Sequence, residues 1–206
     1  MRVVAISDTH MLHEHIDVPY GDVLIHAGDM TSRGSLEEVR AVGKWMASLP
    51  HEHIIVIAGN HDWAFQRKPR EARLALGPRV TYLQDSGCTI DGFKFWGSPW
   101  QPEFYDWAFN LPRGAALKSV WDRIPRDTDV LVTHGPPLGF GDCVRGQHVG
   151  CADLLNALDR VSPRVHVYGH IHEGYGTYQM GRTKLVNAAA CDGQYVPNQA
   201  PIEVTL

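Results

Sequence analysis

The stretch RVHVYGHIHEGYG, residues 164–176, joins a short apolar run to two histidines that are separated by a single residue. Side chains two positions apart on an extended backbone point to the same side, so we expect His170 and His172 to face one point in space. Glycines stand on both flanks of this pair. The stretch therefore predicts a strand that ends at a binding site.

Four other short apolar runs have the same form and end at side chains that can bind metals. They are RVVAIS, DVLIHAG, HIIVIAG and DVLVT, at residues 2–7, 22–28, 53–59 and 129–133. The candidate residues that follow them are Asp8 and His10, then Asp29, then Asn60, His61 and Asp62, and lastly His134. Ligands of open α/β sheets bind beyond the carboxyl ends of the strands. We therefore expect the five strand ends to bring their side chains to one rim.

Helical patterns separate these runs. Ser35 and Glu38 form a capping box ahead of apolar residues at helical spacing, and Pro50 marks the end of that helix. Three further helical patterns occupy residues 69–77, 114–125 and 151–163. Strands that alternate with helices in this way predict an α/β protein with a largely parallel central sheet.

Alternating residues around Asp91-Gly92 and around Gly181 predict two hairpins, which would build a second, mixed sheet. The chain has 206 residues, of which 44% are apolar and 20% are charged. These values are ordinary for a globular chain, and the length suffices for one substantial core. We expect a single domain over residues 1–206.

Composition also narrows the function. A net charge of -4 and the lack of a Lys/Arg cluster argue against binding of long nucleic acid, whereas a small phosphorylated substrate stays open. No apolar run approaches the length of a membrane span, and the N-terminal residues lack a secretory pattern, so we expect a cytoplasmic protein without membrane contact. The four cysteines show no C-x-x-C pair and are expected to be reduced thiols.

The converging side chains offer oxygen and nitrogen donors without a thiolate. They are Asp8, His10, Asp29, Asn60, His134, His170 and His172. Such a set suits Mn, Fe, Zn, Co or Ni, with Mn or Fe favoured, and differs from structural zinc sites. Seven ligands fit two ions about 3.5–4 Å apart that share one bridging carboxylate. Asp29 is the natural bridge, because a carboxylate has two oxygens.

Five short motifs occur in order along the chain and together resemble the calcineurin-like metallophosphoesterases. The motifs are D-x-H at Asp8 and His10, G-D-x(4)-G from Gly28 to Gly34, G-N-H-D from Gly59 to Asp62, an isolated T-H-G at His134, and G-H-x-H from Gly169 to His172. Each motif is weak alone, but five in order are specific. The segments GSPWQPEFYDWAFNLPRG and THGPPLGF further resemble the metallophosphoesterase-domain-containing family.

The resemblance implies a double β-sandwich flanked by helices, in four layers α/β/β/α. It also implies which residues hold which ion. Asp8, His10 and His172 would hold the first ion. Asn60, His134 and His170 would hold the second, and Asp29 would bridge the two.

The chemistry expected of such a pair is hydrolysis of a phosphoester. Two divalent ions acidify a bridging water, and the resulting hydroxide attacks phosphorus in line with the leaving oxygen. By its family position, His61, which follows Asn60 but points elsewhere along the chain, would protonate the leaving group or stabilise the developing charge, and Asp62 would orient it. Related phosphatases carry an arginine where Arg33 stands, which could contact phosphate, although a solvent-facing position is the interpretation we favour.

We expect a phosphodiesterase for small substrates, cyclic nucleotides among them. The aromatic-rich residues 97–109, with Trp100 and Trp107, could form walls for a base. A phosphomonoesterase or a nuclease with the same metal site is the alternative, together with a catalytically silent metal or nucleotide binder. The oligomeric state stays open, with a dimer as one option.

Overall fold

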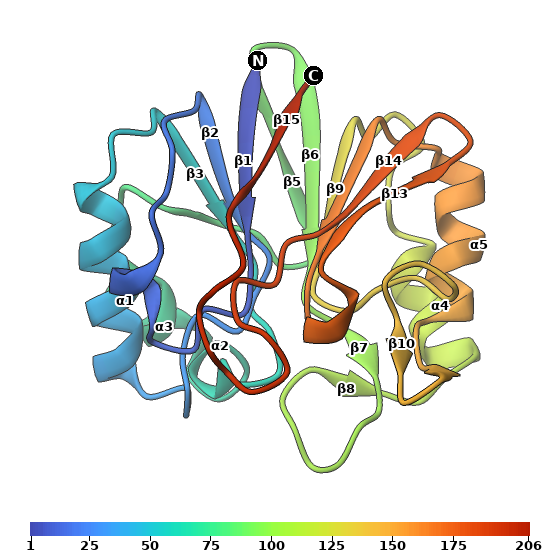
Figure 1. The fold of residues 1–206 in the computed structure, drawn as a ribbon, viewed down its shortest axis with the longest axis horizontal. Helices are drawn as coiled ribbons and strands as arrows, with labels where there is room; N and C mark the ends of the chain where they lie inside the picture. The colour runs from blue at the N-terminus through green and yellow to red at the C-terminus, as the bar shows by residue number, and fades with distance from the viewer.

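Two β-sheets stack against each other in the middle of the molecule, and helices cover the outer face of each sheet (Figure 1). The computed structural model describes residues 1–206. Its layers follow the order α/β/β/α that the resemblance implies, so the expected fold class is confirmed.

The first sheet has five strands in the order β15-β1-β2-β3-β4. Its parallel members are β1 (Arg2–Ile6), β2 (Val23–His26), β3 (His53–Val56) and β4 (Thr81–Tyr82), and β15 (Ile202–Thr205) pairs antiparallel with β1. Three helices pack on its outer face: α1 (Leu36–Ser48), α2 (Trp63–Arg67) and α3 (Pro69–Leu76).

The second sheet has six strands in the order β13-β14-β12-β9-β6-β5. Its parallel members are β6 (Phe93–Ser98), β9 (Val130–Thr133), β12 (Val165–Tyr168) and β14 (Thr183–Asn187), with β5 (Ser86–Ile90) and β13 (Gly176–Met180) antiparallel at the edges. The helices α4 (Ala115–Trp121) and α5 (Ala152–Val161) pack on its outer face.

Both faces of each sheet are buried, which explains why the central strands are continuous apolar runs. In β1, Val3 and Ala5 belong to the core between the sheets, whereas Val4 and Ile6 belong to the core under the helices. Parallel strands that are covered on both sides need apolar residues at every position.

The strands that precede the candidate ligands lie in two sheets instead of one. β1, β2 and β3 belong to the first sheet, and β9 and β12 belong to the second. The second sheet that the hairpins indicated is present, but it also contains β9 and β12, which the sequence pattern had placed in one parallel sheet with β1, β2 and β3, because periodicity identifies strands but not their partners. The strand ends still meet: the Ala190 amide, which follows β14, donates to the Ser7 carbonyl after β1 at 2.8 Å. The rim is the shared end of the two sheets.

The local signals in the sequence are confirmed. Ser35 Oγ accepts from the Glu38 amide at 3.1 Å, and Glu38 Oε2 accepts from the Ser35 amide at 3.2 Å, so the capping box opens α1. Asp91 and Gly92 have φ of 48° and 82° in the turn of the β5–β6 hairpin. The second hairpin, β13–β14, turns at Gly181.

Short elements complete the connections. They are the ladder of β7 (Gln101–Pro102) with β8 (Asn110–Leu111), the ladder of β10 (Cys143–Val144) with β11 (Gln147–His148), and the 3-10 turns η1 (His13–His15) and η2 (His172–Gly174). The longest helix, α1, has 13 residues. No helix combines the length and the apolarity that a membrane span requires.

His166 is a fully buried histidine in the middle of β12. The Thr133 hydroxyl donates to the Gly135 carbonyl, so His166 Nε2 donates to Thr133 Oγ1 at 2.8 Å. Burial lowers the pKa of His166 to about 3. The folded protein therefore excludes a proton that the unfolded chain binds below pH 6.5.

We expect the free energy of unfolding to fall as the pH drops from 6.5 towards 3. Glutamine in place of His166 retains an N–H donor but does not titrate. The decrease in the free energy of unfolding between pH 7 and pH 4.5 should therefore be smaller in His166→Gln by roughly 2 kcal/mol. Urea denaturation of both proteins at the two pH values measures this difference. An identical pH dependence of the two would contradict the assignment.

Candidate metal centre

Four candidate ligands leave their strands in a left-handed backbone conformation. The φ angles are 54° at Asp8, 43° at His10, 54° at Asp29 and 67° at His170. Residues other than glycine seldom adopt positive φ, and such strain concentrates at functional sites. The sharp turns direct these side chains back into the junction between the sheets.

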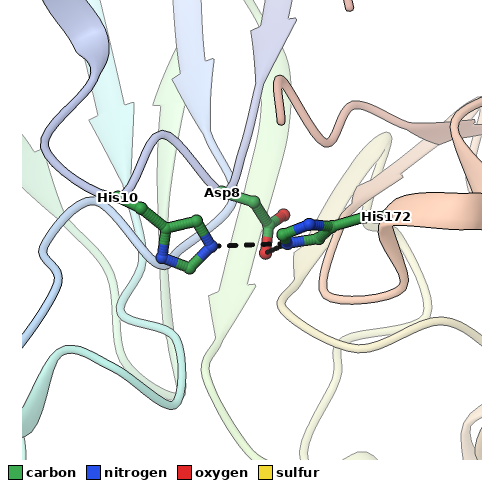
Figure 2. A group of neighbouring side chains, drawn as sticks. All are labelled: Asp8, His10 and His172. Carbon is green, nitrogen blue, oxygen red and sulfur yellow. Dashed lines mark hydrogen bonds and ion pairs between the residues drawn. The ribbon is translucent and has the colours of Figure 1, made fainter. Parts of the chain in front are cut away.

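A first group consists of Asp8, His10 and His172 (Figure 2). The two Nε2 atoms of His10 and His172 lie 3.3 Å apart, and His172 Nε2 lies 3.5 Å from Asp8 Oδ1. Asp8 Oδ2 accepts from the His170 amide at 2.9 Å, whereas Asp8 Oδ1 is buried without a hydrogen-bond donor. One carboxylate oxygen thus connects the two sheets, and the other faces the site.

A second group consists of Asp29, His134 and His170, with Asn60 beside it. His134 Nε2 lies 3.4 Å from Asp29 Oδ2 and 3.0 Å from Asn60 Oδ1. Asp29 Oδ1 accepts from the His61 amide at 2.7 Å. Asp29 therefore resembles Asp8: one carboxylate oxygen accepts from a backbone amide, and the other oxygen, Oδ2, faces the site.

His61, the chain neighbour of Asn60, also lies in this cluster. Its Nε2 atom lies 4.0 Å from Asp29 Oδ2, and it forms a third group of donors with Asp29 and His10. Its Nδ1 donates to the Ser32 carbonyl at 2.9 Å. The indole of Trp107 stacks on its ring, with 4.4 Å between the ring centroids.

Backbone carbonyls determine which nitrogen of three histidines faces the site. His61, His134 and His172 each donate from Nδ1, to the carbonyls of Ser32, Ala27 and Asp192 respectively. In the neutral imidazole this leaves Nε2 as an acceptor. A carbonyl partner on the opposite nitrogen is typical of histidines that bind metals.

The side chains present fit bound cations. His134 Nε2 faces Asn60 Oδ1 and Asp29 Oδ2, and His172 Nε2 faces Asp8 Oδ1. Acceptors that face each other in a buried place need a proton or a metal ion between them. Oxygen and imidazole donors without thiolate suit divalent first-row metals. The chain therefore has candidate metal-binding residues at the junction of the sheets.

Protons take the place of metal ions when none is bound. Burial raises the pKa of Asp8 and Asp29, but neighbouring imidazoles lower it by more, so both carboxyls have a pKa well below their ordinary range. Burial lowers the pKa of His134 and His172, but Asp29 and Asp8 respectively raise it to about 9. Metal ions would have to displace protons from these imidazoles.

Asp62 does not orient His61, so the expected role was wrong. Its Oδ1 accepts from the amide and hydroxyl of Thr31 at 3.0 and 2.6 Å, and its Oδ2 accepts from the Gly59 amide at 2.8 Å. Burial, followed by the charge of Asp29, raises its pKa to about 6. Asp62 joins the loops after β2 and β3, and the Ser32 carbonyl instead sets the ring of His61.

A cavity of about 430 Å³ opens over the cluster. Trp107 lines it. Trp100 does not line it, because its indole Nε1 donates to Asp85 Oδ2 at 2.8 Å and its ring packs against Phe109. Arg33 is exposed and lines a separate, smaller hollow beside the start of α1.

The sequence did not single out several other residues that line the cavity, namely Glu103, Arg113, Glu173 and Tyr195. Glu103, Arg113 and Tyr195 lie in loops without a metal-type motif, and Glu173 directly follows the candidate ligand His172 in η2. The aromatic-rich residues 97–109 include Phe104, which also lines the cavity, but not Tyr195. Folding brings these distant segments to one opening.

Comparison with known proteins agrees with this geometry. The family model for calcineurin-like phosphoesterases matches residues 1–174. The human protein named Metallophosphoesterase domain-containing protein 1 is 48% identical over 230 residues, which cover 100% of this chain and 71% of that protein. UPF0046 protein K07C11.7 of Caenorhabditis elegans is 42% identical over 205 residues, covering 93% of this chain and 70% of that protein.

Solved structures share the fold at low sequence identity. The protein TT1561 of Thermus thermophilus has a TM-score of 0.64 at 14% identity, covering 90% of this chain and 88% of that one. Another solved structure has a TM-score of 0.71 at 18% identity and covers 90% of this chain and 89% of its own. These likenesses support the double sandwich and say nothing further about activity.

Gly59 allows the second group to form, because a Cβ at this position would collide with Asp29 Oδ1 and with the ring of His134. We expect Gly59→Ala to weaken Mn²⁺ binding by displacing these two side chains. Gly135→Ala is the matched control, since its Cβ would meet only Gln101 Cβ at 3.6 Å. Calorimetric Mn²⁺ titration of both variants tests this prediction, and equal affinities would contradict it.

Proposed function

The chain belongs to the calcineurin-like phosphoesterase family, and from this premise we propose that it is a dinuclear metal-dependent phosphodiesterase for small substrates such as cyclic nucleotides. The family supports a metal-dependent hydrolase. The observation that carries the two-metal proposal is the arrangement of donors in two groups, with Asp29 of the second group also lying within reach of His10 of the first.

Seven residues would hold the metal pair in this proposal. Asp8, His10 and His172 would hold one ion, and Asn60, His134 and His170 would hold the other. Asp29 would bridge through Oδ2, because Oδ1 is engaged by the His61 amide at 2.7 Å. Bound ions supply the positive charge that acidifies water and neutralises phosphoryl oxygens.

In this proposal His61 would give a proton to the leaving group. Its Nδ1–H is committed to the Ser32 carbonyl, so the proton that it can transfer is the one on Nε2 of the imidazolium form. The stacked indole of Trp107 and the hydrogen bond to Ser32 hold the ring in one orientation. A fixed acid needs little rearrangement during reaction.

The charge of the cavity favours a phosphodiester over a monoester. Arg113 is the sole Lys or Arg among the lining residues, and its guanidinium already donates to the carbonyls of Gly150 and Val149 at 2.7 and 2.6 Å. Glu103 and Glu173 line the same cavity. A diester carries one negative charge on its phosphate, so it demands less from this lining than a monoester dianion.

Exchange of His61 for alanine should lower kcat by roughly 10²–10⁴ while both metal ions stay bound, because a positioned acid contributes about this much. The loss should be smaller for esters with good leaving groups, which need little protonation. Steady-state kinetics on a series of phosphate esters whose phenol leaving groups differ in acidity, with metal analysis of each preparation, measures both effects. Metal loss in proportion to activity would show that His61 is a ligand instead of an acid.

Metal-stripped protein should be inactive and should regain activity with Mn²⁺. We then expect a higher kcat/KM for 3′,5′- and 2′,3′-cyclic AMP and for bis-p-nitrophenyl phosphate than for AMP and p-nitrophenyl phosphate. Trp107→Ala should reduce the nucleotide values more than Trp100→Ala, which alters a tryptophan outside the cavity. A kcat/KM that is tenfold higher for the monoesters, which corresponds to about 1.4 kcal/mol of transition-state preference, would instead establish a phosphomonoesterase.

A further inference from the structure

The segment between β14 and β15 forms a loop that is built around Asp192. Asp192 Oδ1 accepts from the amides of Gln194 and Val196 at 2.8 and 3.0 Å, and Asp192 Oδ2 accepts from Asn198 Nδ2 at 2.8 Å. The Asp192 amide donates to the Val196 carbonyl at 2.9 Å. These bonds give the loop a defined shape although it contains no helix or strand.

The loop is tied directly to a candidate metal ligand. The Asp192 carbonyl accepts from His172 Nδ1 at 2.9 Å and from the Tyr195 amide at 2.9 Å. One backbone oxygen thus sets the ring of His172 and the position of Tyr195. The two side chains are therefore fixed relative to each other.

Tyr195 itself has a φ of 60°, in the left-handed region. For a bulky residue this conformation is an outlier, and glycine would adopt it without strain. Strain at a defined loop position points to a use for the side chain that is placed there. The strained turn therefore directs attention to the position of the Tyr195 side chain.

The ring of Tyr195 lies over the first group of ligands. Its centroid is 4.9 Å from that of His10 and 5.1 Å from that of His172. The residue lines the cavity and is 53% exposed. Its hydroxyl makes no hydrogen bond within the chain, whereas the hydroxyls of Tyr175 and Tyr178 donate to backbone carbonyls.

We propose that Tyr195 contacts the substrate, with its hydroxyl donating a hydrogen bond to a phosphoryl oxygen at the ion that Asp8, His10 and His172 would hold. The inference rests on the proposed function, because it takes a phosphoester as the ligand. A phenol is protonated at neutral pH and is therefore a donor to an anionic oxygen. Since Arg113 is the sole Lys or Arg of the lining and donates to backbone carbonyls, Tyr195 adds a hydrogen-bond donor beside the first group of ligands.

The exchange Tyr195→Phe tests the hydroxyl, since it retains the ring and the backbone conformation. We expect kcat/KM to fall by roughly 10- to 100-fold, as for loss of a hydrogen bond to a charged group. The affinity of the Mn²⁺-loaded protein for inorganic phosphate, measured by calorimetry, should fall in the same direction. The number of bound Mn²⁺ ions should stay unchanged.

The exchange Tyr195→Gly removes the ring and the strain together. Asp91→Gly is the matched control, because Asp91 also has a positive φ of 48° but lies in the β5–β6 turn away from the cavity. Neither variant should lower the thermal midpoint of the metal-free chain. Only Tyr195→Gly should weaken phosphate binding.

Three results would decide against the proposal or against its premise. Wild-type phosphate affinity in both Tyr195 variants would overturn the contact. Loss of Mn²⁺ in step with phosphate affinity would overturn it as well, because Tyr195 would then support the ligands instead of the substrate. A wild type that binds phosphate through Tyr195 but cleaves no ester would overturn the phosphoesterase function while supporting the contact.

Discussion

Two carboxylates, Asp8 and Asp29, are buried where the two sheets meet, and the rest of the site follows from the need to compensate their charge. Each lies at the end of a strand, and each gives one oxygen to a backbone amide: Asp8 to that of His170, and Asp29 to that of His61. The other oxygen of each faces imidazoles. A buried carboxylate without partners would destabilise the fold. The histidines that face Asp8 and Asp29 therefore also stabilise the junction of the two sheets.

Compensation by imidazoles also prepares the site for metal ions. The carbonyls of Ala27 and Asp192 accept from Nδ1 of His134 and His172, which directs both Nε2 atoms towards the carboxylates. These carbonyls belong to the backbone of the fold, so the orientation of the rings does not depend on flexible side chains. Preorganisation of this kind is typical of histidines that bind metal ions.

The same junction explains where strain and close packing are tolerated. Asp8, His10, Asp29 and His170 all have positive φ, and a Cβ on Gly169 would collide with Asp8. The cost is offset by hydrogen bonds between the loops, such as that from the Asp8 amide to the Gly28 carbonyl at 2.9 Å. Loops that carry function are held here by neighbouring loops of both sheets, which limits the motion of the cavity floor.

The sequence alone determined the features that depend on neighbours along the chain. Apolar runs predicted β1, β2, β3, β9 and β12, the capping box of Ser35 and Glu38 predicted the start of α1, and the candidate donors followed from the residues at the strand ends. Tertiary structure decided which sheet each strand joins, that His61 turns into the cluster, that Asp62 binds Thr31 and Gly59, and that Tyr195 reaches the site from residues far along the chain. The physical reason is that periodicity and capping act over a few residues, whereas the direction of a side chain at a left-handed turn, and the partner of a sheet face, depend on packing between segments that are distant in the sequence.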